Sequence, residues 1–170
     1  MNINTKSAEF LLQQLKVLVV DDNAFSRAIV RGLLKTIGVD TILEAGDGIE
    51  ALELIRSAPP DIVILDWEMP LLNGPELVRI VRSPGVFPTP DIPIVMLTAH
   101  GERRRIVESV KLGVNEFLCK PVSAKSLLER LISILLKPRE NVKLGSFYGP
   151  LPRIPAPKPA PIGGTASLPI

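Results

Sequence analysis

Five short runs of apolar, largely β-branched residues recur along the first 120 residues of this chain, separated by amphipathic helical patterns. Such runs suit strands that are buried on both faces, and intervening helices make successive strands parallel. Hydrophobic residues make up 46% of the chain, which is enough to bury a sizeable core. We therefore expect an α/β fold, in which a doubly wound parallel sheet carries helices on both faces.

The boundaries of these elements follow from the pattern. The expected strands are residues 16–20, 39–44, 61–66, 94–98 and 115–119. The expected helices are residues 24–37, 49–57, 76–82, 102–112 and 123–136. Right-handed crossovers leave few possible strand orders, and we predict the flavodoxin-like order 2-1-3-4-5 with five helices. In such sheets ligands bind beyond the carboxyl ends of the strands, which directs attention to the residues there.

Prolines divide the chain into a domain and a tail. Eight of the 17 prolines lie in residues 138–170. The run RIPAPKPAPI in this segment favours extended polyproline geometry. We therefore predict an N-terminal extension at 1–14, a domain at 15–137 and a flexible Pro-rich tail at 138–170 that the domain does not need for stability.

Composition excludes several classes of protein. A formal net charge of +2 is too small to indicate a nucleic-acid or anionic-membrane partner. One cysteine excludes a disulfide framework, and one histidine argues against a multi-histidine metal site. The first residues do not form a signal peptide, and no apolar run approaches the roughly 20 residues of a membrane span. We expect a cytoplasmic protein with no nucleic-acid or membrane partner.

Polar side chains follow four of the expected strands. Asp21 and Asp22 end the first strand, Asp66 ends the third, Thr98 the fourth and Lys120 the fifth. Because the carboxyl ends of parallel strands meet at one edge, we expect these side chains to lie close together. Three neighbouring carboxylates repel one another, and oxygen ligands without histidine or thiolate favour Mg²⁺ as the cation that relieves the repulsion. A lysine and a hydroxyl are suitable partners for phosphoryl oxygens.

Four motifs occur in order at these strand ends: LVVDDN, ILDWEMP, MLTA and CKP. Together they resemble the receiver domain of two-component response regulators over about residues 15–136. The resemblance implies that Asp66 accepts a phosphoryl group. It also implies that Asp21, Asp22 and Asp66 hold Mg²⁺ with the backbone carbonyl of Glu68.

The resemblance assigns further roles around the acceptor. Thr98 and Lys120 would bind phosphoryl oxygens, and Phe117 falls at the aromatic switch position, although plain core packing suits it nearly as well. Glu68 and His100 would flank the path of the hydrolytic water and tune the lifetime of the phosphorylated state. A solvent-exposed histidine is an equal alternative for His100.

Two smaller expectations concern neighbouring segments. The resemblance implies a cis peptide bond between Lys120 and Pro121. The three consecutive arginines at 103–105 are more typical of a solvated helix face than of a nucleic-acid patch.

The implied function is Mg²⁺-dependent phosphoryl transfer from a histidine kinase or a histidine phosphotransfer protein to Asp66, which switches a protein-binding surface. The partner would be an unidentified downstream protein, and the chain a monomer or a weak phosphorylation-dependent dimer. No output domain is expected, and the protein would be no enzyme beyond catalysing its own phosphorylation and dephosphorylation. One alternative is a phosphate-independent interaction module, which typically lacks one of the acids or the lysine. The other is a dehalogenase-type phosphatase, which wants a second aspartate where Glu68 stands.

Overall fold

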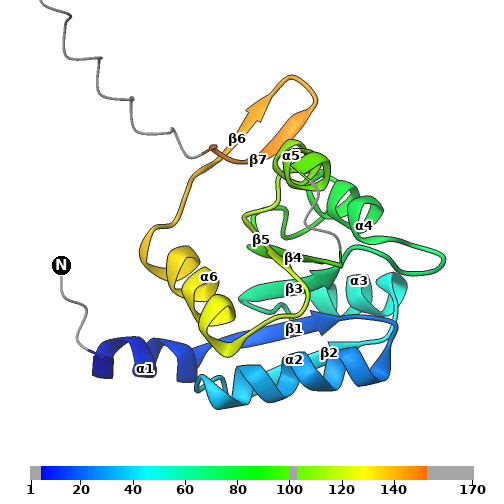
Figure 1. Cartoon of the computed structure of the whole chain (residues 1–170). Helices are drawn as coiled ribbons and strands as arrows, with labels where there is room; N and C mark the ends of the chain where they lie inside the picture. The colour runs from blue at the N-terminus through cyan, green and yellow to red at the C-terminus, as the bar shows by residue number, and fades with distance from the viewer. Residues whose placement is uncertain (1–4, 100–102, 153–170) are drawn as a thin grey trace, which may run out of the picture.

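The computed structural model describes residues 5–99 and 103–152 and contains a five-stranded parallel sheet of order β2-β1-β3-β4-β5, as predicted (Figure 1). The sheet strands are β1 (Lys16–Val20), β2 (Thr41–Ala45), β3 (Ile62–Asp66), β4 (Ile94–Thr98) and β5 (Glu116–Cys119). The helices are α1 (Thr5–Gln14), α2 (Ala24–Thr36), α3 (Gly48–Ser57), α4 (Gly74–Val81), α5 (Arg103–Leu112) and α6 (Ala124–Leu136). The five predicted helices correspond to α2–α6, and each predicted element agrees with the structure within two residues at either end.

Side chains at the helix starts explain why the elements begin where they do. Asn23 and Asp47 cap α2 and α3, because each side chain accepts a hydrogen bond from a backbone N–H three residues later. Asn73 and Ser123 form capping boxes at the starts of α4 and α6. Every residue of β3 and β4 is buried, as the apolar runs predict for central strands.

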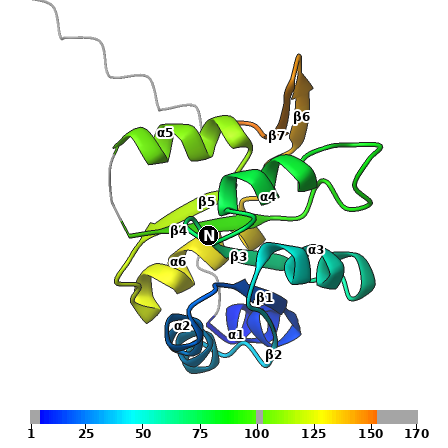
Figure 2. The same ribbon diagram turned by 90° about the vertical axis from the view of Figure 1, so that its right-hand side faces the viewer.

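Helices cover both faces of the sheet and enclose a core on each (Figure 2). Val17 and Ile64 point to the face covered by α2 and α6, whereas Leu18 and Leu65 point to the face covered by α3 and α4. The additional helix α1 lies in the predicted N-terminal extension, and its Leu12 joins the core under α2 and α6. In the described part of the chain, no helix is long and apolar enough to cross a membrane.

A buried arginine organises the loop between α4 and β4, which contains four prolines. Arg82 donates hydrogen bonds of 2.8 Å to the carbonyl oxygens of Gly113 and Ile92 and one of 2.9 Å to Oδ1 of Asn115. Burial lowers the pKa of Arg82 to about 10. The hydrogen bonds of this guanidinium join the loop to the start of β5. They lie at the amino-terminal ends of the strands, opposite the ends that carry the acids.

The predicted extended tail is wrong for residues 141–150. These residues form a hairpin of β6 (Asn141–Leu144) and β7 (Phe147–Pro150), with Gly145 at a positive φ of 59° in its turn. Only three of the 17 prolines fall in 138–152, so most prolines of the segment 138–170 come after the hairpin. The proline content of the full segment therefore gave no indication of a short hairpin at its start. The boundary at residue 137 stays a prediction, and residues 153–170 lie outside the described part of the chain.

The hairpin packs beside α5, at the end of the molecule away from α2 (Figures 1 and 2). Tyr148 donates its hydroxyl to Asp91, and Asn141 donates its amide to the same carboxylate at 2.8 Å. Gly149 lies against Gly113 so closely that a Cβ built on it would meet the Cα of Gly113 at 2.5 Å. The contact requires glycine on both sides, and the segment after residue 137 is therefore docked on the domain.

We expect Gly149→Ala to loosen the hairpin, because the added methyl group would overlap backbone at 2.5 Å. The cost of overpacking is about 1–3 kcal/mol, which thermal unfolding and limited proteolysis at residues 141–150 would detect. The control is Gly32→Ala on α2, where the Cβ meets nothing within 4 Å and stability should hold or rise. Equal midpoints and equal cleavage in both variants would contradict a docked hairpin.

Candidate functional site

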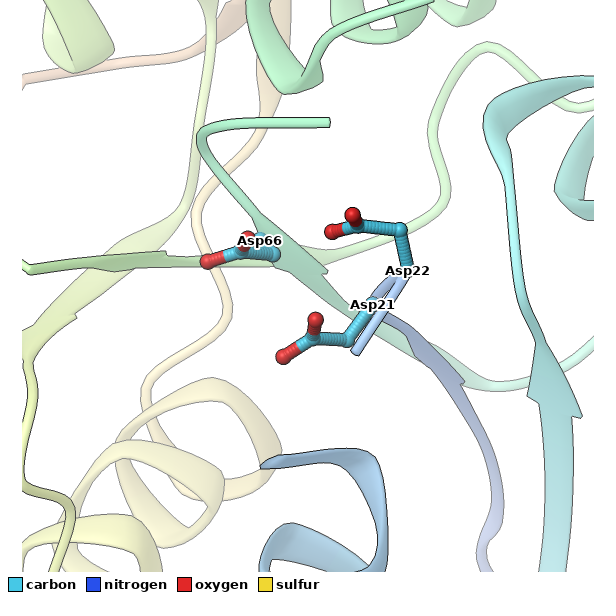
Figure 3. Close-up of side chains that lie close together, drawn as sticks. All are labelled: Asp21, Asp22 and Asp66. Carbon is cyan, nitrogen blue, oxygen red and sulfur yellow. The ribbon is translucent and has the colours of Figure 1, made fainter. Parts of the chain in front are cut away.

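Three carboxylates meet at the carboxyl ends of β1 and β3, which are neighbours in the sheet (Figure 3). Asp21 and Asp22 directly follow β1, and Asp66 is the last residue of β3. One carboxylate oxygen from each of the three lies within 4.8 Å of the others. Asp21 and Asp66 are buried, whereas Asp22 is exposed. The three predicted acids therefore form one cluster that opens to solvent on the side of Asp22.

Lys120, which directly follows the edge strand β5, reaches this cluster. The Nζ of Lys120 lies 2.9 Å from Oδ1 of Asp66 and 3.3 Å from Oδ2 of Asp21. It also lies 3.2 Å from the hydroxyl oxygen of Ser26, in the first turn of α2. The Lys120–Pro121 bond is cis, as predicted. Ser26 was not predicted, although a polar residue shortly after an Asp-Asp-Asn turn is the signal that would have indicated it.

The electrostatics of the cluster follow from burial and crowding. Burial raises the pKa of Asp66, and the charges of Asp21 and Asp22 raise it further, while Lys120 opposes both. Burial alone would lower the pKa of Lys120, but its hydrogen bond to Asp66 and the nearby acids outweigh this, so that pKa is raised. The lysine therefore stays charged at neutral pH, and one cation does not fully compensate the acids.

The backbone around the acids is held tightly. The carboxylate of Asp21 accepts a hydrogen bond of 2.9 Å from the N–H of Asn23, and the carbonyl of Asp21 accepts one of 2.7 Å from Arg27. Beyond β3, the N–H of Gly74 donates to the carbonyl of Trp67 at 3.0 Å. A Cβ on Gly74 would meet the carbonyl oxygen of Asp66 at 2.5 Å, so glycine is required there. These contacts fix the positions of the carboxylates before any ligand binds.

A second group of side chains lies beside the carboxylates. Thr98 is buried at the end of β4, and Glu68 is exposed in the loop after β3. Both contact Arg105, whose Nη2 lies 2.6 Å from Oε1 of Glu68 and whose Nη1 lies 3.4 Å from Oγ1 of Thr98. The guanidinium also stacks over Trp67, 5.3 Å from the ring centroid. The expectation of a solvated arginine face is therefore wrong for Arg105.

The remaining predicted residues lie outside the carboxylate cluster. Phe117 is half-buried in β5, next to Met96 of β4, and Arg130 of α6 lies over its ring at 5.8 Å from the centroid. His100 lies outside the described residues, so its place beside the acceptor stays a prediction.

The donor set of the cluster fits magnesium. Asp21, Asp22 and Asp66 offer carboxylate oxygens, the ligands that Mg²⁺ prefers, and Mg²⁺ needs only one or two of them because it keeps several waters. The exposed carboxylate of Asp22 leaves room for those waters and for a phosphoryl oxygen. A doubly wound sheet with carboxylates, a lysine and a hydroxyl at its strand ends is the arrangement expected of a domain that binds Mg²⁺ and phosphoryl groups.

The chain belongs to the response regulator receiver domain family, whose model matches residues 17–132. It is 39% identical to chemotaxis protein CheY1 of Helicobacter pylori over 122 residues, which cover 71% of this chain and 97% of that protein. Membership implies a histidine kinase as the phosphodonor, Mg²⁺ as the cofactor and a role in two-component signalling rather than conventional enzymatic turnover.

Solved structures agree with this assignment. Chemotaxis protein CheY4 of Vibrio cholerae has a TM-score of 0.62 and 34% identity, over 69% of this chain and 95% of that chain. The receiver domain of the histidine kinase CKI1 from Arabidopsis thaliana, complexed with Mg²⁺ and BeF₃⁻, has a TM-score of 0.60 and 30% identity, over 76% of this chain and 96% of that chain.

Asp66→Asn should stabilise the protein in the presence of a chelator, because it removes a buried charge that burial and two acids disfavour. We expect the thermal midpoint to rise by about 2–4 °C, which is roughly 1 kcal/mol in a chain of this size. Since the raised pKa makes the folded state bind the proton more tightly, wild-type stability should fall as pH rises above 3.8, the ordinary value. The variant should lack this component of the pH dependence.

The control for this prediction is Asp40→Asn, which changes an exposed aspartate outside the cluster and should leave the midpoint unchanged. Adding Mg²⁺ should raise the wild-type midpoint more than that of Asp66→Asn, because a ligand of the folded state stabilises it by mass action. A lower midpoint for Asp66→Asn in chelator would show that Lys120 overcompensates the acids.

Proposed function

We propose that Asp66 accepts a phosphoryl group from the phosphohistidine of a kinase or of a phosphotransfer protein. The observation that carries this assignment is that the carboxylate of Asp66 lies beside those of Asp21 and Asp22 and 2.9 Å from the Nζ of Lys120. In this proposal Asp21, Asp22, Asp66 and the backbone carbonyl of Glu68 hold Mg²⁺. The complex of the plant receiver domain with Mg²⁺ and BeF₃⁻ supports a site of this kind.

In the transfer step, an oxygen of Asp66 forms a bond to phosphorus while the bond from phosphorus to the donor nitrogen breaks. The electron pair of that bond stays with the imidazole of the donor. Lys120 and the hydroxyl of Thr98 stabilise the charge on the equatorial phosphoryl oxygens. Mg²⁺ held by Asp21, Asp22 and Asp66 would supply further positive charge to the transferred group. Catalysis is mainly positioning, and the hydrogen bonds around Asp21 and Trp67 provide it.

The output is a change in a protein-binding surface formed by α5, β5 and α6. Thr98 moves toward the phosphoryl group, and Phe117 fills the space that it leaves. Support comes from the register of the sheet, which places Phe117 beside Met96, two residues before Thr98 on β4. We propose that the surface binds an unidentified downstream protein in the cytoplasm, and that the chain is a monomer or a weak phosphorylation-dependent dimer.

Specific observations disfavour the two alternatives. A dehalogenase-type phosphatase requires a general acid two residues after the nucleophile, and here Glu68 pairs with Arg105 at 2.6 Å. A phosphate-independent module would lack part of the site, whereas here Asp21, Asp66 and Lys120 are all present and in contact.

Acetyl phosphate and Mg²⁺ should add one phosphoryl group to the wild-type chain, measured by intact mass. Asp66→Asn should abolish this addition, and Asp22→Ala should slow it at least about tenfold, since loss of a metal ligand weakens charge stabilisation. Asp40→Asn is the matched control and should react as the wild type does. Undiminished labelling of Asp66→Asn would contradict the assignment of Asp66 as the acceptor.

The fluorescence of Trp67, the one tryptophan in the chain, should change on addition of Mg²⁺.

The lifetime of the phosphorylated state tests the predicted roles of Glu68 and His100. Glu68 is bulky and anionic, and its ion pair with Arg105 holds it near the acceptor. Its side chain should therefore shield the phosphoryl group from water. We expect the group to persist for minutes or longer, and Glu68→Ala or His100→Ala to speed its loss. Slower loss in either variant would show that the residue assists the attacking water instead.

A further inference from the structure

Arg105 connects three parts of the site that come from different segments of the chain. Its guanidinium lies 2.6 Å from the carboxylate of Glu68, 3.4 Å from the hydroxyl of Thr98 and 5.3 Å from the ring centre of Trp67. Glu68 and Trp67 directly follow the acceptor Asp66, and Thr98 ends the adjacent strand β4. The side chain of Arg105 is 22% exposed, so it lies against the site and not in solvent.

The geometry needs an arginine. A planar guanidinium can lie flat on an indole and still donate from its edge to a carboxylate and a hydroxyl, whereas an ammonium offers only a point charge. The neighbouring Arg104 is exposed and belongs to the solvated helix face that the sequence predicts.

We propose that Arg105 is a positioning residue for phosphoryl transfer, which holds the Glu68 carboxylate and cancels its charge at the entrance to Asp66. The inference rests on the proposed function, because it concerns the approach of a phosphodonor to that acceptor. Arg105 acts through Glu68 and through the hydroxyl of Thr98, and it forms no covalent bond in the reaction.

The charges of the site explain why this cancellation matters. Three aspartates and Lys120 sum to −2, which one Mg²⁺ brings to zero. Without the guanidinium of Arg105, the carboxylate of Glu68 would add negative charge to the entrance and would repel a donor whose phosphoryl group is itself negative. Paired with Arg105, the same carboxylate adds no net charge. The pair is partly exposed, so its loss should change the stability of the fold little.

The test measures the rate at which acetyl phosphate with Mg²⁺ phosphorylates the full chain, followed by intact mass. In this reaction the bond from Asp66 oxygen to phosphorus forms, and acetate leaves with the electron pair of the broken bond. Arg105→Gln should slow the reaction by roughly three- to tenfold at low salt, the effect of one unscreened charge several ångströms from a dianion. The matched control Arg104→Gln should react like the wild type.

Two further measurements distinguish a loss of charge from a loss of structure in Arg105→Gln. The double variant Glu68→Gln/Arg105→Gln should react within about twofold of the wild type, because removing the carboxylate together with the guanidinium restores the net charge at the entrance. The deficit of Arg105→Gln should also shrink as salt rises toward ~0.5 M, since screening removes repulsion but not misfolding.

An unchanged rate for Arg105→Gln would overturn the inference. So would a double variant that stays as slow as Arg105→Gln, because that result places the guanidinium on the phosphoryl group itself. Either result leaves the acceptor role intact provided that wild type is labelled and Asp66→Asn is not. If wild type is not labelled, the proposed function fails and this inference fails with it.

Discussion

The mutual repulsion of three carboxylates at one edge of a parallel sheet governs the design of this molecule. Oxygens of Asp21, Asp22 and Asp66 lie within 4.8 Å of one another, and two of these side chains are buried. The raised pKa of Asp66 shows that Lys120 does not fully offset burial and the neighbouring acids. The carboxylate cluster is therefore electrostatically unfavourable by itself, and a bound cation would relieve this repulsion.

Contacts from the surrounding fold hold the three carboxylates close together despite their mutual repulsion. Hydrogen bonds from Asn23 and Arg27 hold the turn after β1, and the close approach of Gly74 holds the turn after β3. At the opposite edge Arg82 joins the proline-containing loop to β5, and the hairpin covers the end of α5. Stabilising contacts therefore lie at both ends of the strands, and those at the carboxyl ends hold the carboxylates in place against their mutual repulsion.

The sequence predicted the sheet order and the acid cluster because both depend on local patterns. A run such as residues 62–66 specifies a buried strand by itself, and parallel topology then brings the strand ends together. Ser26 and Arg105 were missed because their roles depend on which face of a helix meets the site. Arg105, the last of three consecutive arginines, contacts Glu68, 37 positions away, and no periodicity within the run indicates this contact. The hairpin was missed because proline content was averaged over a segment longer than the hairpin.

The charge added by phosphorylation provides the driving force for the proposed switch. A carboxylate carries one negative charge, and an acyl phosphate carries two, so the site becomes more negative although a cation already neutralises it. Lys120 is already bonded to Asp66, so the additional charge must be met by donors that are not yet on the acceptor. Thr98 is the hydroxyl at the end of the adjacent strand, and it is buried. Its movement toward the phosphoryl group would therefore disturb packing around β4 and β5 as well as the contact with Arg105, which is how a local charge becomes a change of surface.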